Sequence, residues 1–193
     1  MARINCPRCV RPQKQCLCKL IPSLKSNTRV WILQHPSEQK HALNTARFVA
    51  LGLCDCQLQV AEDFAALKDK LATNGSYLLF PHAEAKAVET LPLGEVKQLI
   101  VLDGTWRKAK LLLHLNPWLA ALPKLSLTVE HASRYRLRKA PNAQSLSTIE
   151  AVVACLSVLE PDTDFSPLLN PFEALIEGQI SAMGQKIYKK NYQ

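Results

Sequence analysis

The chain has 193 residues and a formal net charge of +8 at pH 7; 48% of its residues are hydrophobic and 21% are charged. This composition is typical of a globular protein, and no apolar run approaches the roughly 20 residues that a membrane-spanning helix needs. The first residues lack the apolar segment of a secretory signal. We therefore predict a cytoplasmic protein without membrane association, in which cysteines stay reduced.

Two segments carry most of the excess positive charge. Residues 1–37 contain seven basic and no acidic residues, and residues 131–149 also lack acidic residues. The basic residues of the second segment are Arg134, Arg136, Arg138 and Lys139. Two basic surfaces on a nearly neutral body indicate a polyanionic partner, most commonly a nucleic acid. The alternative is that these charges are solvated and have no partner.

Four cysteines lie close together near the N-terminus, with the spacing C-x2-C-x6-C-x-C. They are Cys6, Cys9, Cys16 and Cys18. Thiolates this close repel one another unless a cation gathers them, and four sulfur ligands suit zinc in structural sites. We predict a zinc-binding head over residues 1–27, folded by its metal and presenting Arg8, Arg11 and Lys14 to phosphates. Unliganded thiols, or a redox pair formed by the last two cysteines, are the alternatives.

The other three cysteines are scattered along the chain in apolar surroundings. They are Cys54, Cys56 and Cys155. Free cysteine is among the residues most often buried, so we expect buried thiols without chemistry at these positions.

After the head, short apolar runs alternate with helical patterns, which predicts an α/β body over residues 28–193. The predicted strands of this body are residues 30–34, 56–60, 77–80, 98–102 and 125–129. Most of these runs are apolar enough for a mostly parallel sheet that is covered on both faces.

Three helices are predicted around these strands. Ser37 can cap a helix over residues 38–52, whose apolar residues fall on one face. Ser147 and Glu150 form a capping box that opens a second helix, which ends before the next proline. A last helix is predicted over residues 172–188.

Polar residues follow three of the predicted strands, where ligands bind in open α/β sheets. These segments are residues 34–38, 81–83 and 103–106. The alternative at each is a turn with an ordinary helix cap. In the third segment, Asp103 could accept a proton near a cofactor, and Gly104 would let a ligand approach the backbone. No G-x-G-x-x-G loop follows a strand, which disfavours an ordinary dinucleotide site.

The segment Asp103-Gly104-Thr105-Trp106 resembles the signature of the DTW-domain family. Other ordered blocks agree: Cys6, Cys9, Cys16, Cys18 and Ile21; Gln34, His35, Pro36 and Glu38 with Thr45 and Arg47; and residues 135–138 and 146–151. The resemblance covers most of residues 4–155.

The resemblance implies a fold similar to SPOUT RNA-modifying enzymes, in which the C-terminal part of the sheet forms a trefoil knot that holds S-adenosylmethionine. Chain periodicity alone predicts an unknotted sheet. Bacterial members of the family are tRNA-uridine aminocarboxypropyltransferases, so the implied reaction is attack of uridine N3 on the methionine γ-carbon. Asp103 would take the N3 proton, or instead hold the amino group or ribose of the cofactor.

The resemblance and the strand-end positions also imply the site residues. We expect cofactor contacts from Phe80, Pro81, Leu102, Asp103, Gly104, Thr105, Arg136, Ser147 and Thr148. We expect tRNA contacts from His35, Glu38, Arg47, Trp106, Arg107, Arg134, Arg138 and Lys139. Trp106 could also pack in the core, and His35 and Glu38 could equally be a turn residue and a first-turn acid.

Two other functions are compatible with these features. A SPOUT-like RNA methyltransferase would use the same cofactor but release S-adenosylhomocysteine. A non-catalytic, zinc-stabilised RNA-binding protein would bind tRNA in a salt-sensitive way without affinity for the cofactor. The resemblance favours a uridine of the variable loop over one of the D loop, and we expect a monomer.

Overall fold

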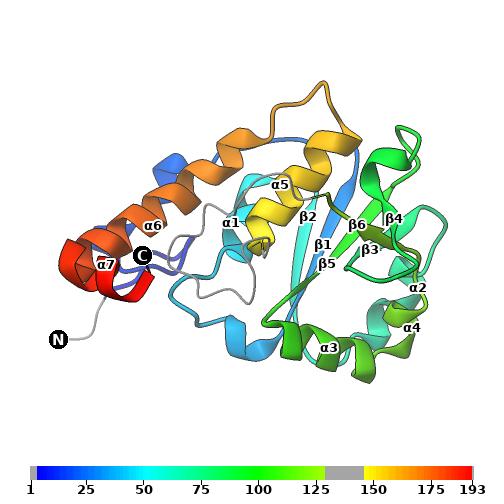
Figure 1. Ribbon diagram of the computed structural model, residues 1–193, viewed down its shortest axis with the longest axis horizontal. Coiled ribbons are helices and arrows are strands. Elements are labelled where there is room, and N and C mark those ends of the chain that lie inside the picture. Colours follow the sequence, from blue (N-terminus) through cyan, green and yellow to red (C-terminus); the bar gives the residue numbers. More distant parts are fainter. Residues whose placement is uncertain (1–3, 129–145, 193) are drawn as a thin grey trace.

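The computed structural model describes residues 4–128 and 146–192. Within these ranges, six strands form one sheet in which all neighbouring strands are parallel. The strands are β1 (Arg29–Gln34), β2 (Cys56–Val60), β3 (Ser76–Leu79), β4 (Lys86–Ala87), β5 (Gln98–Asp103) and β6 (Lys124–Ser126). Their order is β2-β1-β5-β3-β6-β4, so β1 and β5 lie side by side inside the sheet (Figure 1). The predicted α/β fold with a parallel sheet is confirmed.

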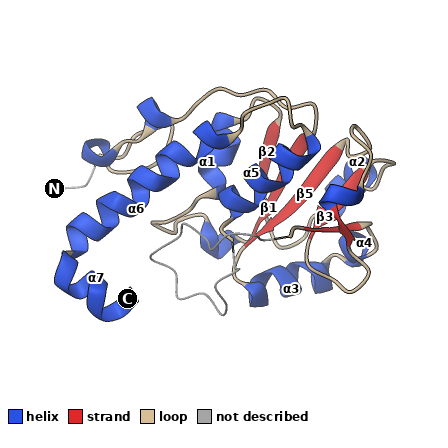
Figure 2. Cartoon of the chain, turned by 45° about the horizontal axis from the view of Figure 1, so that its top comes forward, coloured by secondary structure: helices blue, strands red, loops and turns tan. Residues whose placement is uncertain are grey.

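Helices cover both faces of the sheet (Figure 2). One face is covered by α1 (Ala46–Gly52), α5 (Thr148–Leu159) and α6 (Asn170–Met183); the other by α2 (Lys68–Leu71), α3 (Trp106–Leu115) and α4 (Pro117–Ala120). A further helix, α7 (Gln185–Tyr192), follows α6. Short 3-10 helices are η1 (Gln13–Gln15), η2 (Cys18–Leu20), η3 (Pro36–Glu38), η4 (Ala65–Leu67), η5 (Val88–Thr90) and η6 (Ser166–Leu169).

Strand β1 shows how the sheet separates two hydrophobic cores. Val30 and Ile32 point into the core under α1, α5 and α6, whereas Trp31 and Leu33 point into the core under α2, α3 and α4. All four side chains are buried, because successive residues of a strand face opposite sides. A sheet covered on both faces explains why the strand sequences are almost continuously apolar.

The structure corrects the helix predicted over residues 38–52. The chain forms η3 and then turns, and helix α1 begins only at Ala46. The side chain of Asn44 causes this change: its amide nitrogen donates to the carbonyl of Glu38, and its oxygen accepts from the N–H of Arg47. Asparagine thus closes the turn and caps the helix after it.

The two C-terminal helical predictions had different outcomes. The capping box of Ser147 and Glu150 is present, and α5 follows it as predicted. The single helix predicted over residues 172–188 is wrong, because Gly184 adopts a φ of 83° and separates α6 from α7. This left-handed conformation is available to glycine at a helix end.

Glu160, at the C-terminal end of α5, holds the segment that leads from the cysteine head into β1. Its two carboxylate oxygens accept hydrogen bonds from the main-chain N–H groups of Asn27 and Thr28, each at 2.9 Å.

Within the described ranges, every helix is too short or too polar to cross a membrane.

Candidate active site and metal centre

Asp103 lies at the carboxyl end of β5, directly beside the end of β1. The register pairs Asp103 with Gln34, the last residue of β1. The Gln34 amide nitrogen donates to Oδ2 of Asp103 at 2.7 Å, and the Thr148 hydroxyl donates to Oδ1. The carboxylate is only 8% exposed. Residues from two central strands and the first turn of α5 therefore hold one carboxylate in place.

The residues after Asp103 turn the chain tightly into α3. Thr105 is the N-cap of this helix, and its hydroxyl accepts from the N–H of Lys108 at 3.4 Å. A Cβ atom on Gly104 would lie 3.0 Å from the Cβ of Lys108 and 3.7 Å from that of His35. Glycine therefore lets β1, β5 and α3 approach closely at this edge.

Two contacts of acidic side chains lie at this edge of the sheet. Lys108 donates to the carboxylate of Glu38 at 2.6 Å, and both side chains are mostly shielded from solvent. His35 Nε2 lies 3.1 Å from the carboxylate of Glu62. The main-chain N–H of Ser37 donates to His35 Nδ1, so a neutral His35 carries its proton on Nε2, facing Glu62. These contacts fix the orientation of His35 and Glu38.

An aromatic pair lies beside the same edge. The rings of Phe80, after β3, and Trp106, at the start of α3, meet edge to face with centroids 5.8 Å apart. Trp106 remains 40% exposed. An aromatic ring that is held by a neighbour and partly exposed can stack against a nucleobase.

Except for Arg47, whose guanidinium donates to a carbonyl of the cysteine head, the predicted cofactor and tRNA residues fall into three groups. The structure gathers Asp103, Gly104, Thr105, Thr148, His35, Glu38, Phe80 and Trp106 at or beside the carboxyl edge. Ser147 is buried in its capping box, Leu102 lies in β5, and Pro81 and Arg107 are exposed. Arg134, Arg136, Arg138 and Lys139 lie outside the described residues.

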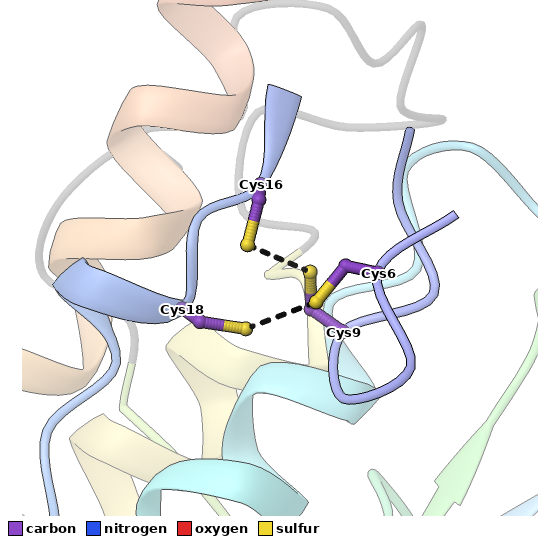
Figure 3. Close-up of side chains that lie close together, drawn as sticks. All are labelled: Cys6, Cys9, Cys16 and Cys18. Atoms are coloured by element: carbon purple, nitrogen blue, oxygen red, sulfur yellow. Dashed lines mark hydrogen bonds between the residues drawn. The ribbon is translucent and has the colours of Figure 1, made fainter. Parts of the chain in front are cut away.

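The four cysteines of the head converge on one point (Figure 3). Their sulfur atoms all lie within 4.8 Å of one another; Cys6 and Cys18 are 3.6 Å apart, and Cys9 and Cys16 are 3.8 Å apart. A tetrahedral site with zinc–sulfur bonds of about 2.3 Å separates its sulfur atoms by about 3.8 Å. The four thiols therefore fit a metal ion of this kind.

Two of the four thiols have pKa values that are shifted in opposite directions. Main-chain N–H groups, first that of Cys9 and then that of Arg8, lower the pKa of Cys6 to about 6. Burial, followed by contacts with the neighbouring thiols, raises the pKa of Cys18 to about 12. Binding of a metal ion by all four thiols would therefore displace a proton from Cys18 and would depend on pH.

Two arginines join the head to the body. Arg11 donates to the carbonyls of Gln15 and Ala42, at 3.1 and 3.2 Å. Arg47 donates to the carbonyls of Cys9 and Gln39, at 3.3 and 3.1 Å. Each planar guanidinium bridges two carbonyls, one of them in the head and the other in the turns after η3. The head is thereby connected to the segment that carries Glu38.

The other three cysteines were predicted to be buried, and this prediction is wrong for one of them. Cys56 and Cys155 are buried as expected, and burial raises the pKa of both thiols to about 12. Cys54 is exposed, because it lies in the turn between α1 and β2 rather than inside an element.

Comparison with known proteins identifies the family. The DTW domain matches residues 3–180 of the chain. The chain belongs to the DTW-domain family. No solved structure matches it.

Several relatives carry the name of an enzyme. The chain is 35% identical, over 98% of its length, to tRNA-uridine aminocarboxypropyltransferase 2 of Mus musculus. It is 33% and 31% identical, over 92% of its length, to the proteins of the same name from Macaca fascicularis and Drosophila melanogaster. The chain spans 68%, 64% and 76% of the length of these three relatives.

Three residues at the carboxyl edge were not predicted as site residues of this DTW-domain protein. They are Gln34, Glu62 and Lys108. The signal for Gln34 was available, since a polar residue ends an otherwise apolar strand. No local sequence pattern marks Glu62 and Lys108, because their partners are distant along the chain.

Proposed function

We propose that this DTW-domain protein transfers the 3-amino-3-carboxypropyl group of S-adenosylmethionine to N3 of a uridine in tRNA. The observation that carries the proposal is the position of Asp103, the acid of the family signature, at the carboxyl edge of the sheet with both oxygens held by donors. The names of the relatives support the same reaction.

The reaction forms a bond between uridine N3 and the methionine γ-carbon as the bond from that carbon to sulfur breaks. Sulfur takes the electron pair and leaves in methylthioadenosine, and the N3 proton passes to a base. The sulfonium already activates the carbon, so the protein must align the two substrates and accept the proton. Positioning can contribute up to about 7 to 11 kcal/mol, and a placed base roughly 10²- to 10⁴-fold.

Asp103 is our proposed base. Donors on both carboxylate oxygens stabilise its ionised form, which is the form that accepts a proton, and fix its orientation. In the alternative role, the same carboxylate would hold the amino group or ribose of S-adenosylmethionine.

The proposed binding residues for S-adenosylmethionine surround this carboxylate. They are Phe80, Pro81, Leu102, Gly104, Thr105, Ser147 and Thr148, together with Arg136 from the segment outside the described residues. The group fits a ligand of this kind, because it combines a buried acceptor, a hydroxyl and an aromatic ring. Arginine would pair with the carboxylate of the methionine part.

The proposed tRNA contacts come from several segments of the chain. Trp106 and Arg107 are exposed at the start of α3. His35 lies close to Gly104, the residue after Asp103, and Glu38 forms an ion pair with Lys108 of α3. The contribution of Arg47 would be indirect, since its guanidinium donates to carbonyls of the chain. Arg134, Arg138 and Lys139 are proposed to hold phosphates.

For the molecule as a whole, we propose a zinc-binding head over residues 1–27 and a SPOUT-like catalytic domain over residues 28–193. The geometry of the four sulfur atoms supports zinc as the structural ion. The knot stays a prediction, since most of the chain between β6 and α5 lies outside the described residues. The monomeric state and the cytoplasmic location also stay predictions.

The test is incubation of unmodified tRNA with the protein and S-adenosylmethionine, followed by mass spectrometry of the nucleosides and the small-molecule product. The proposal expects aminocarboxypropyl-uridine and methylthioadenosine, and fragment mapping would then place the uridine. Methylated RNA with S-adenosylhomocysteine would identify a methyltransferase instead. Tight tRNA binding without any modification would favour the non-catalytic protein.

A further inference from the structure

Gln34 is an unusual residue for its position. It ends β1, whose preceding residues are the buried apolar Val30 to Leu33, and its own side chain has 0% exposure. Its amide nitrogen donates to Asp103, but among the described residues its amide oxygen Oε1 has no hydrogen-bond partner. A buried amide oxygen without a hydrogen-bond partner destabilises a fold, so stability alone does not explain a glutamine at this position.

The contact with Asp103 defines how the Gln34 amide is turned. An ionised carboxylate only accepts hydrogen bonds, so the nitrogen of the amide must face it and the oxygen must face away. Thr148 donates to the other carboxylate oxygen. The two donors come from different elements, β1 and α5, and each binds its own oxygen, which restricts rotation of the carboxylate.

Gln98, a second glutamine of the same sheet, has a structural role and serves as a comparison. Gln98 begins β5, at the opposite end of the strand from Asp103. Its amide oxygen accepts from the Trp31 indole at 2.9 Å, and its amide nitrogen donates to Lys70, Thr73 and Ser76. Gln98 uses both ends of its amide within the fold, whereas Gln34 uses one end, toward Asp103.

We propose that Gln34 is a positioning residue that holds the Asp103 carboxylate ionised and correctly oriented for its work on the substrates. The inference rests on the proposed function of Asp103 but concerns a residue that does not itself touch the substrates. Thr148 donates to the other oxygen of the same carboxylate.

The experiment compares Gln34→Met, which removes the donor at similar size, and Gln34→Glu, which places an acceptor against Asp103, with the control Gln98→Met. In both Gln34 variants we expect kcat to fall by roughly 10- to 100-fold, with KM for tRNA and S-adenosylmethionine nearly unchanged, since small displacements of a reacting group have effects of this size. Gln98→Met should lower the melting temperature and leave kcat per folded molecule unchanged.

A double variant separates positioning from a general structural effect. If Gln34 acts through Asp103, Gln34→Met should cost little further kcat in an Asp103→Asn background, because the two residues act as one unit. Additive losses, or an equal loss of kcat in Gln98→Met, would overturn the inference.

One readout does not depend on turnover. The carbon-13 signal of the Asp103 carboxyl, assigned by its absence in Asp103→Asn, should move in Gln34→Met and stay in place in Gln98→Met. If wild-type protein transfers no aminocarboxypropyl group, the proposed reaction fails, and this signal still decides whether Gln34 positions Asp103. An unmoved signal in Gln34→Met overturns the positioning role.

Discussion

The cysteine head and the carboxyl edge of the sheet both bring functional groups together, but different forces hold them. In the head, four thiols converge between short turns, and η1 and η2 are its only helical segments in the described residues. At the carboxyl edge, Asp103 and Gln34 extend from strands that are buried between two hydrophobic cores. The four thiols of the head fit a bound metal ion, whereas the groups at the edge are positioned by the strands and helices of the fold.

Removing the metal should have the largest effect, and this effect should be strongest in the head. In Cys9→Ser we expect loss of bound zinc and unfolding of the head, because structural zinc contributes about 10 to 16 kcal/mol in small zinc-binding peptides. Elemental analysis would measure the metal, and hydrogen exchange would compare the amides of residues 4–24 with those of β5. The exposed Cys54→Ser is the control and should keep its metal. Retention of zinc by Cys9→Ser would show that the four thiols do not form one site.

At the carboxyl edge, Asp103→Asn should remove function without unfolding the protein. Asparagine keeps the size of the side chain but is a poor proton acceptor, so turnover should fall by roughly 10²- to 10⁴-fold. Transfer to tRNA measures turnover, and calorimetry measures binding of S-adenosylmethionine. Asp55→Asn, at an exposed position before β2, is the matched control. Preserved turnover with weaker cofactor binding would assign Asp103 to cofactor binding instead.

Glu160→Ala should destabilise the segment that leads from the cysteine head into β1. The substitution removes the acceptor of the N–H groups of Asn27 and Thr28. Hydrogen bonds to a charged group contribute about 1.5 to 3 kcal/mol each, so the free energy of unfolding should fall by about 3 kcal/mol. Urea denaturation would measure it, with the neighbouring exposed Asp162→Ala as the control. Equal stability of both variants would contradict a joining role for Glu160.

The smallest expected effect concerns Tyr77, a residue of β3. Its hydroxyl donates to the carboxylate of Glu95, and this bond, together with burial, raises the pKa of Tyr77 to about 12. An unfolded tyrosine has a pKa of about 10, so the stabilisation is complete below that pH and is lost as the pH rises through about 12.

Tyr77→Phe tests this contact. The variant should be about 1 kcal/mol less stable than wild type near neutral pH, the typical contribution of one hydrogen bond. Urea denaturation at increasing pH should show this difference shrinking once tyrosine begins to ionise. A difference that is constant up to the alkaline limit would mean that packing of the ring, not the hydrogen bond, is responsible.

Several elements could be predicted because a local pattern specifies them. The apolar runs of β1 and β5 identified two strands of the sheet, and Ser147 with Glu150 identified the start of α5. The helix predicted over residues 38–52 failed because the competing bonds of Asn44 are not visible in hydrophobic periodicity. Strand β4 was missed because two residues are too few for any periodic pattern.

By itself, the sequence determined the cysteine cluster, the signature acid Asp103 and the alternation of strands and helices, because each depends on residue type and short spacing. Only the tertiary structure decided which groups surround them. Gln34 meets Asp103 because β1 and β5 are adjacent, and Arg47 reaches Cys9 because α1 lies beside the head. Such contacts join residues that are distant along the chain, and they form only when hydrophobic burial brings the elements together.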